Sequence, residues 1–97
     1  MVRRIARKFH PLRIILFGSR ARGTAGPDSD VDLLVVFPRI ASHHRKTAEI
    51  YRLLADSQLP KDILVATPAD LEAQRNVVGT VIRAALREGK TLYERSA

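Results

Sequence analysis

Hydrophobic residues follow two different spacings along the chain, and the two alternate. Apolar side chains recur every three or four positions in three segments, which predicts amphipathic helices at residues 1–10, 42–56 and 67–89. Short continuous apolar runs predict strands at residues 13–17, 31–37, 62–66 and 91–94. This mixture predicts an α/β (α+β) protein in which helices pack on a small mixed β-sheet.

The predicted helices carry recognisable end signals. Ser42 is a candidate N-cap, and Thr67 opens a Thr-Pro-Ala-Asp run that supplies an N-cap, a proline at the first helical position and an acid at the third. We expect the last helix to continue through Gly79 and to end with Gly89 at the C′ position. Its expected apolar face consists of Val77, Val78, Val81, Ile82, Ala85 and Leu86.

Composition limits the classes of protein to consider. The 97 residues, 45% hydrophobic, predict a single globular domain over residues 1–97. No cysteine is present, which excludes disulfides and thiolate metal sites, and no apolar run reaches the length of a membrane span. We therefore expect a cytoplasmic protein without a membrane partner. The formal net charge of +7 suits a polyanionic partner such as nucleotide phosphates, although basic surfaces are also simply solvated.

Two aspartates stand at the head of a strand that is otherwise apolar. Asp30 and Asp32 are two residues apart, so their side chains point to the same face of the strand. Two such carboxylates repel each other unless a cation lies between them, and no Lys or Arg adjoins them in the sequence. A hard divalent cation such as Mg²⁺, which prefers oxygen ligands, would relieve this repulsion.

A third aspartate occupies the matching place on another strand. Asp62 begins its predicted strand, as Asp30 and Asp32 begin theirs. If these two strands are parallel neighbours joined by a right-handed helical crossover, all three acids lie at one edge of the sheet. The first strand ends at Gly18-Ser19, which reaches the same edge if that strand runs antiparallel to the second. The sequence therefore predicts a mixed sheet.

The Gly18-Ser19 turn has its own chemistry. A glycine lets the backbone approach a ligand closely, and a helix that begins at Ser19 would offer unpaired N–H groups to phosphate. Arg20 and Arg22 could add charge-assisted hydrogen bonds to phosphate oxygens. Taken alone, a Gly-Ser pair or a strand-initial aspartate is usually structural. A phosphate cradle beside three acids instead indicates phosphoryl or nucleotidyl transfer assisted by two metal ions.

These residues resemble a known family. Gly18-Ser19, ten residues, and then Asp30-Val31-Asp32 match the signature of the polymerase-beta nucleotidyltransferase superfamily, whose catalytic domain has a palm-like fold. The runs FGSRARG and SDVDLL look like its minimal nucleotidyltransferase branch, and GKTLY near the end looks like the last strand of that branch. The resemblance covers nearly the whole chain, and nothing in the motif departs from an active site.

The resemblance implies a role for each residue. Gly18 and Ser19 would hold the triphosphate of a nucleotide, most simply ATP. Asp30 and Asp32 would ligate two Mg²⁺ ions, for which Mn²⁺ could substitute, and Asp62 would complete the metal site and accept the proton of the acceptor. A hydroxyl would attack the α-phosphorus and release pyrophosphate.

The resemblance also implies a partner. Minimal nucleotidyltransferases are often paired with a helical HEPN-domain toxin, and some act as antitoxins that adenylylate a tyrosine of that toxin. Larger relatives carry an additional helical domain, so we expect a HEPN-type protein or a second copy of this chain to supply the missing wall. Two alternatives remain open: an antitoxin that masks its partner only by binding it, and, less favoured, a basic nucleic-acid-binding module.

Other polar residues have simpler interpretations. His43 and His44 are adjacent, so they diverge on a helix and do not form a ready chelate; we expect a solvated first turn. Tyr51 and Tyr93 are expected to pack their rings and leave their hydroxyls in water.

Overall fold

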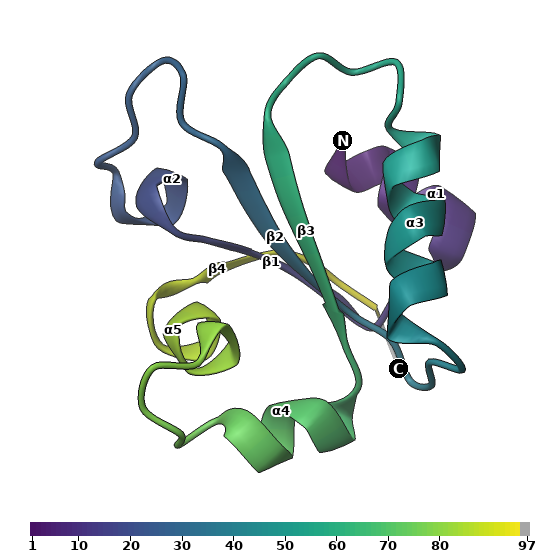
Figure 1. Cartoon of the computed structure of the whole chain (residues 1–97), viewed down its shortest axis with the longest axis vertical. Coiled ribbons are helices and arrows are strands. Elements are labelled where there is room, and N and C mark those ends of the chain that lie inside the picture. The colour runs from purple at the N-terminus through teal and green to yellow at the C-terminus, as the bar shows by residue number, and fades with distance from the viewer. Residues whose placement is uncertain (96–97) are drawn as a thin grey trace.

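Four strands form the mixed sheet at the centre of the molecule, shown in the computed structural model of Figure 1, which describes residues 1–95. The strands are β1 (Arg13–Phe17), β2 (Val31–Val36), β3 (Lys61–Ala66) and β4 (Lys90–Glu94). Their order is β3-β2-β1-β4, with β2 and β3 parallel and β1 antiparallel to β2 and β4. The predicted fold class, the parallel pair and the antiparallel first strand are all confirmed.

Helices cover both faces of the sheet. They are α1 (Val2–Phe9), α2 (Ser19–Arg22), α3 (His43–Leu53), α4 (Pro68–Gln74) and α5 (Val81–Glu88). Figure 1 shows α1 and α3 together on one side, with α4 and α5 on the other. No helix within residues 1–95 is both long and apolar enough to cross a bilayer.

Alternation along β2 divides the interior into two cores. Leu33 and Val35 point toward α1 and α3, where they join a cluster that includes Ile5 and Ile50. Leu34 and Val36 point the other way, into a cluster with Ile82 and Ala85 of α5. Because both faces are covered, β2 is apolar on both sides after its first two residues, which explains its continuous hydrophobic run.

The predicted helix starts at Ser42 and Thr67 are confirmed. The Ser42 hydroxyl accepts a hydrogen bond from the Arg45 amide at 3.2 Å. Thr67 and Asp70 form a reciprocal capping box, in which the Thr67 hydroxyl accepts from the Asp70 amide and the Asp70 carboxylate accepts from the Thr67 amide. These side chains satisfy amides that the first turn of a helix leaves without a partner.

The prediction of one long helix after Thr67 is wrong, because two helices replace it. The chain leaves α4 after Gln74 and passes through Gly79, whose φ of +91° is left-handed and interrupts a right-handed helix. Thr80 then caps α5 by accepting from the Arg83 amide at 3.2 Å. As a result Val77 and Val78 are 49% and 80% exposed instead of buried on a helical face.

Gly89 also differs from its prediction. It was expected as a left-handed C′ residue, but its backbone is extended, with φ −74° and ψ 163°. A Cβ atom at this position would collide with the Ala85 carbonyl oxygen and with the Ile15 side chain. The need for a glycine therefore comes from the close approach of the end of α5 to β1, which the local sequence does not reveal.

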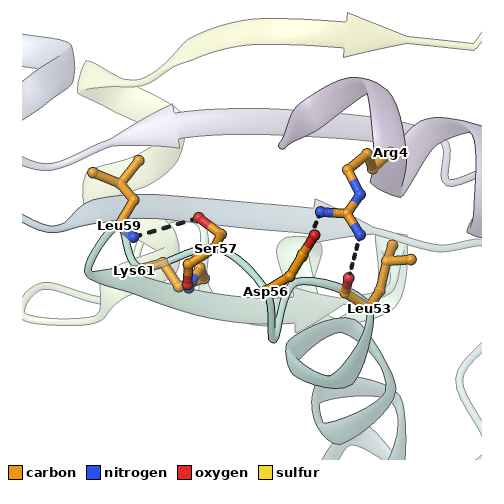
Figure 2. A network of polar contacts seen from close by, with 6 residues as sticks. All are labelled: Arg4, Leu53, Asp56, Ser57, Leu59 and Lys61. Atoms are coloured by element: carbon orange, nitrogen blue, oxygen red, sulfur yellow. Dashed lines mark hydrogen bonds and ion pairs between the residues drawn. The ribbon is translucent and has the colours of Figure 1, made fainter.

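Polar contacts brace the loop that leads into β3 (Figure 2). Arg4 of α1 donates to the Asp56 carboxylate at 2.8 Å and to the Leu53 carbonyl at 2.7 Å. Within the loop, Lys61 donates to the Ser57 carbonyl at 3.3 Å. Both partners of the Arg4–Asp56 pair are well exposed, so the pair contributes little stability. The contacts of Arg4 join α1 to the end of α3 and to the start of the loop that leads to β3.

Candidate active site

Three aspartates gather at the amino ends of β2 and β3. Asp32 and Asp62 are register partners in the parallel pair, and Asp30 directly precedes β2. The Val31 amide donates to the Pro60 carbonyl at 2.9 Å, which aligns the starts of the two strands. By alternation both register partners face the α4–α5 side of the sheet. The expected gathering of the acids at one sheet edge therefore agrees with the observed topology.

The negative charge at this edge is only partly compensated by the protein's own cations. The pKa of Asp32 is raised, first by partial burial and then by the charges of Asp62 and Asp30. Arg22 lowers the pKa of Asp32, but its effect is smaller than that of the three causes that raise it. Ionised Asp32 is therefore destabilised in the folded protein, and a cation bound beside it would reduce this destabilisation.

The turn after β1 lies directly against Asp32. Phe17 is the register partner of Asp32 in the antiparallel pair, and Gly18 follows with φ +75° and ψ −158°, a conformation essentially restricted to glycine. A Cβ atom on Gly18 would collide with the carboxylate oxygen Oδ2 of Asp32. Ser19 then begins α2, a single turn whose first amides have no intrahelical acceptor. The backbone of the Gly18-Ser19 turn therefore lies close to the Asp32 carboxylate.

The two arginines of α2 have protein partners. Arg20 donates from both Nε and Nη2 to the Ser29 carbonyl, at 3.1 and 2.7 Å, and so fastens α2 to the residue before Asp30. Arg22 contacts the Glu88 carboxylate at 3.4 Å from an exposed position. The sequence suggested phosphate as the partner of both arginines. The observed contacts give Arg20 a positioning role in the loop that leads to β2.

The donor set suits a hard cation but does not form a finished coordination cage. Carboxylate oxygens are the ligands that Mg²⁺ prefers, and Mg²⁺ commonly completes its shell with water and substrate phosphate. Within residues 1–95, no three His, Cys, Asp or Glu side chains are grouped closely enough to hold a metal ion by themselves. The raised pKa of Asp32 beside Asp30 and Asp62 is the observation that fits a bound cation here.

Sequence reasoning missed a polar pair at the opposite end of the parallel strands. Nε2 of His43 lies 2.7 Å from Oδ2 of Asp70, so His43 is paired and not merely solvated as expected. His43 starts α3 after β2, and Asp70 lies in the first turn of α4 after β3. Because parallel strands end at the same edge, the starts of these two helices meet. That topological rule could have suggested the pair.

The hydroxyl of Tyr51 also differs from its expected place in water. It accepts a hydrogen bond from the Ile63 amide at 2.9 Å. β3 is an edge strand, so this amide would otherwise point away from the sheet with no strand beside it. Tyr51 therefore caps the edge of β3 one residue after Asp62.

Comparison with known proteins identifies the family and the fold. The sequence matches the family described as nucleotidyltransferase domain over residues 1–89. No curated protein matches the sequence. Among solved structures, the fold is similar to a candidate nucleotidyltransferase from Sulfolobus solfataricus, with a TM-score of 0.67 and 23% identity over 97% of this chain and 74% of that one.

Two further solved structures have a similar fold. One is a toxin–antitoxin structure with AMP-PNP, at a TM-score of 0.57 and 17% identity over 98% of this chain and 71% of that one. The other is a mutant of the toxin–antitoxin MntA–HpeT, at 0.55 and 15% over the same shares. At these identities the likeness establishes the fold. The family match, which spans residues 1–89 of 97, shows that the chain belongs to the nucleotidyltransferase domain family.

Proposed function

We propose that this protein is a Mg²⁺-dependent nucleotidyltransferase that transfers AMP from ATP to a hydroxyl acceptor. The observation that carries the proposal is that Gly18 lies so close to the Asp32 carboxylate that a Cβ atom would collide with it, with Asp62 as the register partner of Asp32. A phosphate held at the turn would then lie beside the row of acids. Either feature alone would be an ordinary structural element.

Each residue has a distinct role in this proposal. The amides of the Gly18-Ser19 turn and the Ser19 hydroxyl bind the triphosphate, and Arg20 and Arg22 remain candidates for further phosphate contacts. Asp30 and Asp32 would hold Mg²⁺ or Mn²⁺, together with Asp62 where a second ion binds. When bound, the metal would neutralise phosphate charge and lower the pKa of the attacking hydroxyl. Asp62 accepts the proton of that hydroxyl.

The acceptor in this proposal is a tyrosine of a HEPN-type toxin, which the protein neutralises as an antitoxin. The similarity to two toxin–antitoxin structures, one of them with AMP-PNP, supports this biological setting. Such a partner, or a second copy of this chain, would also cover exposed apolar residues such as Val78. An antitoxin that masks its partner without chemistry remains the alternative, and the nucleic-acid-binding module is disfavoured by the acid row.

Thermal unfolding with ligands tests the metal and nucleotide site. We expect Mg²⁺ or Mn²⁺ together with ATP to raise the melting temperature, because ligands that bind only the folded state stabilise it. The double variant Asp30→Asn with Asp32→Asn should fold and lose this increase. Asp28→Asn, an exposed aspartate in the same loop, is the matched control and should keep it. An undiminished increase in the double variant would place the site elsewhere.

A further inference from the structure

The helices on the two sides of the sheet differ in charge (Figure 1). On one side, α1 carries four Lys and Arg residues and no acid, and α3 carries three against one acid. On the other side, α4 and α5 together carry two Arg residues and three acids. The first pair of helices therefore has a net charge of +6 and the second pair a net charge of −1, within a chain whose net charge is +7.

The proposed nucleotide site does not account for this positive charge. Asp32 and Asp62 face the α4–α5 side of the sheet, so a nucleotide bound beside them lies on that side. The helices α1 and α3 cover the opposite face, above the core that contains Leu33 and Val35. Their cations therefore point to a second surface with a ligand of its own.

Most cations on this side have no acid beside them. Arg4 pairs with Asp56 at 2.8 Å, and Lys46 pairs with Glu49 at 3.3 Å. In the described part of the chain, six further cations of α1, α3 and the loop between β2 and α3 form no ion pair. We call these exposed residues the cationic face: Arg3, Arg7, Lys8, Arg39, Arg45 and Arg52.

The two helices that carry the cationic face pack side by side and antiparallel. Arg4, near the start of α1, donates to the Leu53 carbonyl at the end of α3. At the other end, Nζ of Lys46 lies 5.3 Å from the ring centre of Phe9, so the end of α1 meets the start of α3. These contacts hold the two rows of cations next to each other.

The cationic face continues across both helices. Lys8 and Arg52 line the same hollow between α1 and α3, which has a volume of about 410 Å³. Glu49 lines this hollow and also a second one at the start of α3, where Arg39 and Arg45 lie. The cations therefore form one surface rather than separate patches.

The spacing of the cations suits a row of phosphates. Arg3 and Arg7 are one helical turn apart, about 6 Å along the axis, and Arg45 and Arg52 are two turns apart, about 10 Å. Double-stranded DNA carries one negative charge per about 1.7 Å of its axis, so several phosphates can lie opposite these side chains at once. Such binding gains its free energy from counterion release and does not require a deep pocket.

The surroundings of the cations favour a nucleic acid over a membrane or an acidic protein. Helices that bind membrane surfaces insert exposed apolar side chains, and protein interfaces have a core depleted of charged residues. Within α1 and α3, which the structure describes in full, the only large hydrophobic residue that is exposed is Tyr51. Its hydroxyl is already bonded to the Ile63 amide at the edge of β3. The cationic face therefore lacks the apolar anchor that the other two partners need.

We infer that the cationic face binds the phosphate backbone of a nucleic acid without regard to base sequence. The bound nucleic acid lies on the side of the sheet opposite the proposed active site and takes no part in the proposed transfer reaction. The acids disfavour nucleic acid beside Asp32 and Asp62, but both of these residues face the other side of the sheet. This inference does not depend on the proposed nucleotidyl transfer.

Fluorescence anisotropy of a labelled DNA duplex, titrated with the full chain over a range of salt concentrations, tests the inference. We expect the logarithm of the affinity to fall linearly with the logarithm of the salt concentration, with a slope of about −4, and to be equal for two duplexes of unrelated sequence. The double variant Arg7→Gln with Arg45→Gln should bring the slope closer to zero by about two and lower the affinity at low salt by about tenfold or more, because two phosphate contacts are lost.

The matched control removes the same charge from the other side of the sheet. Arg75→Gln with Arg87→Gln also replaces two exposed arginines, so both double variants have the same net charge. The control should bind the duplex as the wild type does. The rise in melting temperature with Mg²⁺ and ATP should be the same in the wild type and in both double variants. Absence of that rise in the wild type would overturn the proposed function and leave the duplex result standing.

Three outcomes would overturn the inference. If the wild type does not bind the duplex at low salt, the cationic face is only a solvated surface. If the two double variants lose equal affinity, binding follows the net charge of the protein and not this face. If vesicles of phosphatidylserine and phosphatidylcholine, or polyglutamate, bind more tightly than the duplex, the partner is a membrane or an acidic protein.

Discussion

The two ends of the β2–β3 pair hold aspartates in opposite electrostatic states. At the amino ends, Asp32 faces Asp62 and Asp30, and its pKa is raised by burial and by these like charges. At the carboxyl ends, Asp70 bonds to His43 and to the Thr67 amide, and its pKa is lowered, with the hydrogen bond to His43 as the largest cause. The same two strands thus carry mutually repelling acids at one end, and an acid that has hydrogen-bond partners lies at the other.

The opposite pKa shifts of Asp32 and Asp70 distinguish a functional carboxylate from a structural one, although both residues are aspartates. Asp70 has its partners within the fold, so it stabilises the starts of α3 and α4 and needs nothing further. Asp32 has acidic neighbours and one weakly opposing cation, Arg22. A carboxylate with mainly acidic neighbours, such as Asp32, is a candidate site for binding an external cation at neutral pH.

The largest predicted effect is on the transfer rate at the unsatisfied end. Asp62→Asn should lower the rate of AMP transfer to a tyrosine acceptor by about 10²–10⁴-fold, because the acceptor loses its general base. Nucleotide affinity, measured by calorimetry, should change much less. Asp56→Asn is the control, since Asp56 is satisfied by Arg4 and should not affect transfer. An unchanged rate in Asp62→Asn would remove Asp62 from the reaction.

The next effect in size concerns two glycines with positive φ. Gly18→Ala should lower the free energy of unfolding by about 1–3 kcal/mol and also remove the stabilisation by Mg²⁺ and ATP, because its Cβ would displace the Asp32 carboxylate. Gly79→Ala carries backbone strain too, but a Cβ there meets nothing within 4 Å. Gly79→Ala should therefore lower the free energy of unfolding but retain the stabilisation by Mg²⁺ and ATP. Urea unfolding with and without ligands measures both, and equal ligand effects in the two variants would contradict the proximity of the turn and the acid.

The smallest effect is a difference in pH dependence between the two ends. A raised folded-state pKa means that the contribution of Asp32 is fully present at low pH and is lost as the pH rises through that pKa, so Asp32→Asn should gain stability over the metal-free wild type toward neutral pH. A lowered pKa means the reverse for Asp70: its contribution is present at neutral pH and is lost on acidification.

Urea unfolding of metal-free protein from pH 3 to 7 measures this difference. Asp70→Asn should be less stable than the wild type at neutral pH, and the gap should close as the pH falls. Asp32→Asn should become more stable than the wild type as the pH rises, so its free energy of unfolding should depart from that of the wild type in the opposite direction. Parallel curves for the two variants would mean that the two ends of the strand pair are electrostatically alike.

The sequence by itself determined the strands, the mixed sheet and the gathering of the three acids. The strands depend on regularities that extend over only a few residues, namely apolar runs and the alternation of side chains across a strand. The strand directions depend on a general topological rule, the handedness of a helical crossover. Asp30 and Asp32 share a face because they are two residues apart. Asp62 joins them because the crossover makes β2 and β3 parallel.

Only the tertiary structure decided how distant segments meet. The collision that a side chain on Gly18 would have with Asp32, the hydrogen bonds from Arg20 to the Ser29 carbonyl, and the pairing of His43 with Asp70 all join residues between 9 and 27 positions apart. The division of the last predicted helix at Gly79 likewise follows from backbone geometry that outweighs a helical apolar pattern. Such contacts depend on how whole elements pack, and no local period of the sequence encodes that packing.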